Sequence, residues 1–260
     1  MTMPLQPNGR WLQAWNPRPQ ARLRLICLPP AGAGASFYRD LLPGLPPDVE
    51  LLAVRLPGRE GRFSEPALTG YQQAGAALHA ALRHQFTRPY ALFGHSMGAL
   101  LAYGVALAAR QHGDPAPTRL FVSGTTGPGI PRRRTGRQDW PDQELVADLR
   151  KLGGTAEGVL NDPELLSLIL PVLRADYRLC DSFESSPAFT LGTEPPLDCP
   201  VSVLGGDEDD CTPAELAHWA AVTRGGAIRR SFPGGHFYLR HPSAAAVGAA
   251  VAEDLAAPVV

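Results

Sequence analysis

The chain has 260 residues, of which 44% are hydrophobic and 19% are charged, and its formal net charge at pH 7 is −1. A chain of this length and composition can bury a large core, as ordinary globular proteins do. The near-zero charge gives no electrostatic basis for binding nucleic acid or a membrane surface.

Targeting segments and disulfides are not expected either. Residues 1–22 lack the apolar core of a signal peptide, and no stretch reaches the roughly 18 apolar residues that a membrane-spanning helix needs. The four cysteines are widely spaced and include no C-x-x-C pair, so we expect free thiols in a reducing cytoplasm and no zinc site. They are Cys27, Cys180, Cys199 and Cys211.

Short apolar runs alternate with helical patterns along most of the chain. Runs typical of buried strands occupy residues 23–29, 49–57, 90–94, 119–124 and 199–206, with a weaker candidate at 227–232. Helical patterns occupy residues 71–86, 99–112 and 213–223. This alternation predicts an α/β fold with a mostly parallel central sheet flanked by helices.

The alternation is interrupted at residues 131–196, where no strand is predicted. Residues 142–153 have helical spacing and end at two glycines, whereas residues 162–184 indicate one helix broken at Pro171 or two helices. We therefore predict a helical insertion that covers the carboxyl edge of the sheet as a lid. The predicted parts are a core of residues 1–130 and 197–260 and a lid of residues 131–196.

A pentapeptide, Gly94-His95-Ser96-Met97-Gly98, fits G-x-S-x-G at the point where an apolar run turns into a helical pattern. In α/β-hydrolases such a sharp strand-to-helix turn exposes the serine hydroxyl, and glycines are needed where a Cβ would collide with backbone. The following helix would direct its free N–H groups and positive dipole end at the serine. We therefore predict an α/β-hydrolase fold with Ser96 as its nucleophile.

A serine needs a base, and in this fold the partners follow in the order Ser, Asp or Glu, His. His112 ends the helix after the nucleophile, and His218 lies in a helix that a capping box at Thr212 begins. His236 follows a candidate strand on a glycine-rich loop, where a base must be presented, and we predict it as the base. His241 is the alternative.

The acidic partner is expected after the strand at 199–206, but spacing does not select it. Four candidates follow that strand: Asp207, Glu208, Asp209 and Asp210. A calcium-binding EF-hand loop begun at Asp207 would need glycine at its sixth position and glutamate at its twelfth, where Thr212 and His218 stand. We therefore expect acid–base chemistry in this loop and no metal.

Backbone N–H groups must also stabilise the oxyanion of a tetrahedral intermediate. One donor is the residue after the nucleophile, Met97, and the other comes from the loop after the first core strand, residues 29–37. We predict Ala31 as that second donor. The loop lacks the third glycine of G-x-G-x-x-G and the Gly-Lys-Ser/Thr of a P-loop, so a phosphate cradle is not favoured.

These motifs together resemble the type II thioesterases that accompany modular polyketide synthases and nonribosomal peptide synthetases. The resemblance spans nearly the whole chain. In the first-strand loop, Pro30 replaces the family's usual histidine and Ala33 replaces a usual glycine. Residues 54–66, VRLPGREGRFSEP, match a loop peculiar to this group, and the elbow and residues 149–184 match as well.

The acid and base loops complete the resemblance. The family pattern in the acid loop is glycine, two variable residues and aspartate, which selects Asp209 after Gly206 and leaves Asp207 as the runner-up. The resemblance implies a discrete, monomeric, cytoplasmic hydrolase without a cofactor. Its substrates would be acyl groups on the phosphopantetheine arms of acyl or peptidyl carrier proteins, which it removes to restart stalled synthases and regenerate mis-primed carriers.

Other interpretations stay open. A general carboxylesterase or lipase, an acyltransferase, or a non-catalytic carrier-binding module would share many of these features. The arginine-rich residues 132–137 could meet an acidic carrier protein or form a solvated loop. Four apolar residues of the predicted lid could line an acyl chamber or simply pack the lid onto the core: Leu165, Leu168, Ile169 and Leu173.

Overall fold

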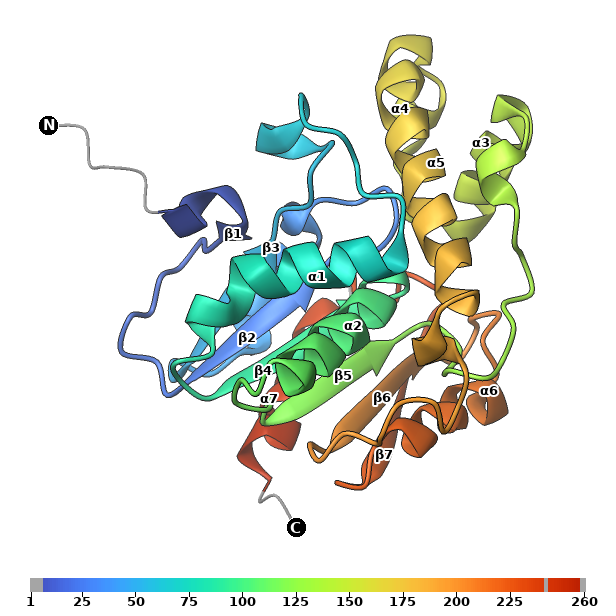
Figure 1. Cartoon of the computed structure of the whole chain (residues 1–260). Coiled ribbons are helices and arrows are strands. Elements are labelled where there is room, and N and C mark those ends of the chain that lie inside the picture. Colours follow the sequence, from blue (N-terminus) through green and yellow to red (C-terminus); the bar gives the residue numbers. More distant parts are fainter. Residues whose placement is uncertain (1–6, 241–242, 258–260) are drawn as a thin grey trace, which may run out of the picture.

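The structure, a computed structural model, describes residues 7–240 and 243–257. A seven-stranded sheet crosses the molecule in the order β1-β3-β2-β4-β5-β6-β7 (Figure 1). β1 pairs antiparallel with β3, and every other neighbouring pair is parallel. The strands are β1 Leu12–Gln13, β2 Leu23–Leu28, β3 Val49–Val54, β4 Tyr90–His95, β5 Arg119–Ser123, β6 Val201–Gly206 and β7 Ala227–Phe232.

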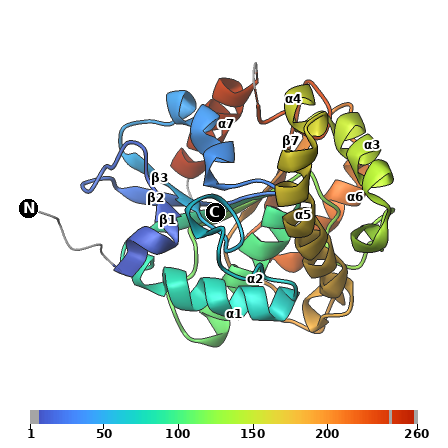
Figure 2. The ribbon, with the colours of Figure 1, turned by 90° about the horizontal axis from the view of Figure 1, so that it is seen from above.

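Helices cover both faces of the sheet. The α-helices are α1 Tyr71–Leu82, α2 Met97–Gln111, α3 Asp142–Leu152, α4 Glu157–Leu160, α5 Pro163–Glu184, α6 Pro213–Ala217 and α7 Ala244–Ala256. The 3-10 helices are Pro7–Arg10, Ala35–Gly44, Glu60–Arg62, Arg83–Gln85, Arg137–Asp139, Pro187–Phe189 and His218–Val222. Seen from above, α7 lies on one side of the sheet and α1 and α2 lie on the other (Figure 2).

Side chains alternate between the two faces because successive residues of a strand point in opposite directions. Ile26 and Leu92 pack in the cluster under α1 and α2. Their neighbours Leu25 and Phe93 pack in a second cluster with α7 and the 3-10 helix Ala35–Gly44. The apolar runs of the central strands are continuous because both faces are buried, and the predicted α/β-hydrolase sheet is confirmed.

Local signals set the ends of several helices. The side chain of Asp162 accepts the N–H groups of Glu164 and Leu165 and so begins α5, with Pro163 at its first position. α3 ends at Gly153, whose φ of +74° is the left-handed conformation that glycine adopts without steric cost. α6 begins with the predicted capping box.

The structure differs from the predicted elements at two places, β1 and Pro171. β1 was not predicted, because two residues carry no periodicity. The predicted break at Pro171 was wrong: α5 runs through it for 22 residues as one helix. Because proline has no N–H, the carbonyl of Ser167, four residues earlier, has no helical partner. Both Pro171 and Ser167 are exposed. That carbonyl can therefore be solvated, so the proline is tolerated.

The carboxyl edge of the sheet gathers the loops that matter for function. The loops after β2, β4, β5, β6 and β7 all emerge there because these strands are parallel, and α3, α4 and α5 stand above that edge (Figure 1). Chain order reverses between β2 and β4, and such switch points are where open α/β sheets bind ligands. Among the described helices, none has the length and apolarity to cross a bilayer.

Candidate active site

Ser96 lies on a strained turn between β4 and α2. Its φ of +54° and ψ of −119° are unusual for a residue other than glycine, and its backbone N–H donates to the carbonyl of Ser123 on β5 (2.7 Å). A Cβ at Gly94 would collide with the backbone of Gly98, and one at Gly98 would collide with the carbonyl of Leu28. The two glycines are thus required for the turn, as the motif predicted.

The acid and base loops meet beside this turn. Nδ1 of His236 lies 3.0 Å from Oδ2 and 3.2 Å from Oδ1 of Asp209. The side chain of Asp209 is only 3% exposed, so the contact is shielded from solvent. A Cβ at Gly206 would collide with the carbonyls of Gly234 and Gly235, so glycine is what lets the two loops approach this closely.

The other acidic residues of the loop have different partners. Asp207, the second candidate for the acid, accepts the backbone N–H of Gly234 (2.8 Å) and so holds the backbone of the base loop. Asp210 forms an ion pair with Arg134 (3.0 Å). The contact with His236 therefore favours Asp209 as the acid.

The other histidines considered as the base lie away from this arrangement or outside the described residues. His112 caps the end of α2 and stacks on His79, with ring centroids 4.3 Å apart. His218 is exposed. His241 falls outside the described residues. The described residues contain no group of three or more His, Cys, Asp or Glu side chains suited to a metal ion.

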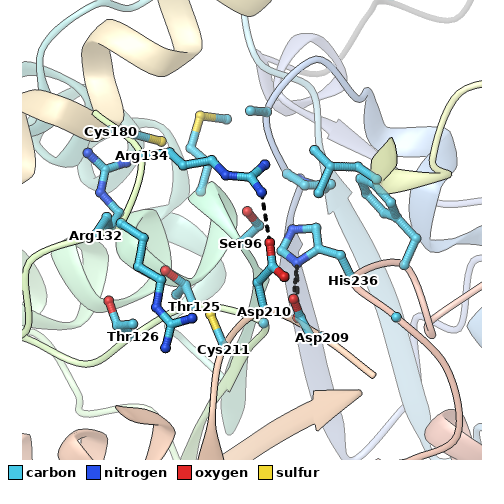
Figure 3. Close-up of a pocket in the computed structure, with 18 of the residues that line it drawn as sticks. Ser96, Thr125, Thr126, Arg132, Arg134, Cys180, Asp209, Asp210, Cys211 and His236 are labelled. Atoms are coloured by element: carbon cyan, nitrogen blue, oxygen red, sulfur yellow. Dashed lines mark hydrogen bonds and ion pairs between the residues drawn. The ribbon is translucent and has the colours of Figure 1, made fainter. Parts of the chain in front are cut away.

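One cavity of about 260 Å³ brings the predicted site residues together. Ser96, His236, Asp209, Met97 and Ala31 all line it. In Figure 3 the imidazole of His236 stands between the carboxylate of Asp209 and the hydroxyl of Ser96. Such an arrangement can pass a proton from a hydroxyl to an imidazole that a carboxylate orients.

Two cysteines also border the cavity, but they are poor nucleophiles. Burial raises the pKa of Cys180 to about 11 and that of Cys211 to about 12. Both thiols are therefore neutral near pH 7, and the thiolate is the reactive form. All four cysteines are free thiols, as predicted.

A buried polar chain supports the site from below. Nδ1 of His95 lies 2.8 Å from Oγ of Ser123, which lies 2.5 Å from the hydroxyl of Tyr238, two residues after the base. Burial, and secondarily the nearby His236, holds the pKa of His95 well below its ordinary value. His95 therefore stays neutral and ties the nucleophile turn to the base loop.

Known proteins match this chain over most of its length. Residues 23–255 match the family described as Thioesterase domain. This chain belongs to the thioesterase family. The gramicidin S biosynthesis protein GrsT of Aneurinibacillus migulanus is 36% identical over 240 residues, which are 92% of this chain and 91% of GrsT. The thioesterase PikA5 of Streptomyces venezuelae is 38% identical, over 89% of this chain and 81% of PikA5.

The solved structures agree. The type II thioesterase BorB from the borrelidin biosynthetic cluster superposes with a TM-score of 0.82 and is 39% identical, over 94% of this chain and 97% of BorB. The resemblance that the motifs indicated is confirmed.

The cavity of this thioesterase is not lined by the four apolar residues considered for it. Leu165 and Leu168 are 39% and 46% exposed, whereas Leu173 is buried and Ile169 packs beside it in a small cluster among α3, α4 and α5. The residues from this segment that do border the cavity include Leu149, Leu152, Tyr177 and Cys180. Helical periodicity identified apolar positions but could not tell which side of α5 faces the cavity.

The arginines of residues 132–137 also border the cavity, but they are paired within the chain. Arg132 pairs with Asp181 and Glu184, and Arg133 pairs with Glu215. Arg134 and Arg137 both bind the buried carboxylate of Asp148. These ion pairs, with that of Arg134 to Asp210, join residues 131–196 to one another, to α6 and to the loop after β6. The run is therefore neither a plain solvated loop nor an open cationic patch.

Proposed function

We propose that this thioesterase hydrolyses acyl thioesters on the phosphopantetheine arms of acyl or peptidyl carrier proteins, as an editing enzyme of polyketide or nonribosomal peptide biosynthesis. The contact that carries the proposal is that of Nδ1 of His236 with the shielded carboxylate of Asp209, in the cavity that Ser96 also lines. Family membership and the names of relatives in gramicidin S and borrelidin biosynthesis supply the substrate class.

In the proposed first half-reaction, Nε2 of His236 takes the proton of the Ser96 hydroxyl as Oγ attacks the thioester carbonyl. Asp209 holds the imidazole in the required tautomer and stabilises its protonated form. The tetrahedral intermediate then collapses, the C–S bond breaks, and His236 returns the proton to the departing pantetheine thiol. In the second half, His236 takes a proton from water, whose oxygen attacks the acyl-serine, and Ser96 regains its proton.

The N–H groups of Met97 and Ala31 are proposed to stabilise the oxyanion. Met97 opens α2, where the helix N-terminus adds a positive partial charge, and Ala31 belongs to the loop after β2 that also borders the cavity. No protein-bound cofactor or metal takes part in these steps.

We further propose that residues 131–196 form a lid on a core of residues 1–130 and 197–260. α3, α4 and α5 stand above the carboxyl ends of the strands, and α3 and α5 contribute residues to the cavity. The protein would act as a cytoplasmic monomer on carrier domains that approach this edge, and it has no proposed nucleic-acid or membrane partner.

The test is mass spectrometry of a panel of carrier proteins loaded with different acyl groups, with and without enzyme. Wild-type protein should release the free acid and leave the unloaded carrier, and Ser96→Ala should lower turnover by about 10⁶-fold. Faster turnover of p-nitrophenyl esters than of any acyl-carrier would indicate a general esterase. An acyl group found on an acceptor other than water would indicate an acyltransferase. Carrier binding without turnover would indicate a binding module.

A further inference from the structure

The loop of residues 57–62, which the sequence singled out and the proposed chemistry does not use, packs against the loop that holds Ala31. The carboxylate of Glu60 accepts the backbone N–H groups of Ala35 (3.0 Å) and Ser36 (3.3 Å) and the hydroxyl of Ser36 (3.0 Å). A Cβ at Gly34 would overlap the Glu60 side chain. The two loops thus fit together without intervening space.

Arg59, the neighbour of Glu60, reaches a buried carboxylate on α5. Its two terminal nitrogens each donate to a different oxygen of Asp176, both at 2.7 Å, and one of them also donates to the carbonyl of Ala33 (3.2 Å). The side chains are 8% and 1% exposed. Taking such a pair out of water is costly, so a buried ion pair is a poor device for stability alone.

Asp176 has a third partner, and this one lies in the oxyanion loop. The backbone N–H of Gly32 donates to Oδ2 of Asp176 at 2.7 Å, across 144 positions of sequence. The peptide unit that carries this N–H also carries the carbonyl of Ala31. Gly32 itself has a φ of +72°, and the N–H of Ala33 closes a turn onto the carbonyl of Pro30 (3.2 Å).

We propose that Asp176 and Arg59 are positioning residues that set the direction of the Ala31 N–H toward the oxyanion. Asp176 fixes the peptide after Ala31, and Arg59 fixes both the carboxylate and the carbonyl of Ala33. The inference rests on the proposed hydrolysis at Ser96. A misplacement of about 1 Å in such a group can cost about 10²-fold in rate, so these contacts matter although neither side chain touches the substrate.

Two paired variants test this. Arg59→Met with Asp176→Asn removes both charges but keeps a carbonyl oxygen that can accept the Gly32 N–H. Arg59→Met with Asp176→Leu removes both charges and the acceptor. The matched control is Arg174→Met, on the same helix, because the Arg174 side chain pairs with Asp142 of α3 and donates to the carbonyl of Gln138 rather than to the oxyanion loop.

The leucine pair should lower kcat about 100-fold with KM within twofold of wild type. The asparagine pair should have a kcat at least tenfold higher than that of the leucine pair. The kcat of the control should stay within twofold of wild type. Thermal unfolding first establishes that both paired variants are folded. Equal kcat values for the two would then overturn the proposal, because a purely structural ion pair would be lost equally in both.

A second readout isolates the oxyanion. An alkyl trifluoromethyl ketone forms a tetrahedral adduct with the serine, whereas an inert pantetheine thioether does not. Across the variants, affinity for the ketone should fall in parallel with kcat while affinity for the thioether stays within twofold. An equal loss of both affinities would overturn the proposal.

If the leucine pair does not fold, Arg59→Lys replaces it, because lysine keeps the charge but cannot span both carboxylate oxygens. It should lower kcat about tenfold with unchanged thioether affinity, and an unchanged kcat would overturn the proposal.

All assays use both an acyl-carrier thioester and a p-nitrophenyl ester, since one oxyanion hole serves both. Wild-type activity on the oxygen ester alone would refute the proposed function. In that case, the comparison of the two paired variants on that ester would still decide the positioning role.

Discussion

Asp207 and Asp209 lie two residues apart on one loop yet have different partners. Asp209 contacts the imidazole of His236 and is shielded, whereas Asp207 is exposed and holds a backbone N–H of the base loop. Asp209→Asn should leave the fold intact and lower kcat about 10⁴-fold, because an amide favours the wrong tautomer of the histidine. Steady-state kinetics on an acyl-carrier thioester measure the effect.

The matched control for that variant is Asp207→Asn. It keeps an oxygen that can accept the Gly234 N–H, so kcat should fall less than tenfold. If Asp207→Asn were the more damaging of the two, Asp209 would not be the acid.

His95 makes stability depend on pH in a predictable direction. Burial keeps it neutral in the fold, whereas the unfolded chain binds a proton below a pKa of about 6.5. Its contribution to stability is therefore complete above pH 6.5 and falls as the pH drops toward the lowered pKa, by up to about 1.4 kcal/mol per pH unit. Urea unfolding between pH 5 and 7.5 measures this slope.

His95→Gln should flatten the slope, and His218→Gln, which removes an exposed imidazole, should leave it as in wild type. A wild-type slope retained in His95→Gln would show that other groups cause it.

Among single residues, those that belong to a short sequence motif were the most predictable. Ser96 and its glycines follow from one strand-to-helix turn, and His236 follows from its position after a strand. The acid needed the family pattern, because four acidic residues share the loop. The bond from Gly32 to Asp176 could not be predicted, because it joins residues 144 positions apart and no local pattern pairs this loop with that helix.

Among the elements, α5 shows where a strong local rule was outweighed. Proline inside a helix normally ends or kinks it, but here the proline lies on the exposed side of a helix whose other side is buried. Pro171→Ala should therefore restore a backbone hydrogen bond and raise the free energy of unfolding by about 1–2 kcal/mol, after the greater freedom of the unfolded chain is counted. Thermal and urea unfolding measure it.

Pro163→Ala is the control for this prediction. Pro163 stands at the first position of α5, where proline is favourable, so its replacement should give no gain. A stability of Pro171→Ala at or below wild type would mean that the proline ring itself contributes to the packing of α5.

The long helices and strands were predictable because each gives an apolar pattern that extends over many residues of the sequence. β4 and α2 are buried almost throughout, so each appears in the sequence as a nearly continuous apolar run. β1 and the 3-10 helices are too short for that. The side of α5 that meets the cavity depends on tertiary packing, so the helix itself was expected, whereas periodicity left open whether its apolar residues line the cavity or pack.

On the scale of the whole molecule, the apolar interior is divided. Two large clusters fill the faces of the sheet, and a smaller one of six buried residues lies among α3, α4 and α5. A small cluster gives less stabilisation by burial, so this segment should open without global unfolding. Hydrogen exchange of peptides from α3 and α4 should report a lower opening free energy than that of peptides from β4 and α2.

Leu145→Ala should leave a cavity in the small cluster and so speed hydrogen exchange in α3 and α4, with little effect on exchange in β4. Uniform acceleration across both regions would instead mean that the molecule opens as one cooperative unit.

The position of Asp176 has a consequence for engineering. A natural route to new acyl preference would be to graft residues 131–196 from a relative, since this segment supplies part of the cavity wall. Such a graft would also exchange the carboxylate that holds Gly32 and Arg59. Chimaeras should therefore be chosen with an aspartate retained at this helical position, or the recipient would receive a new substrate chamber and lose the geometry of its reaction centre.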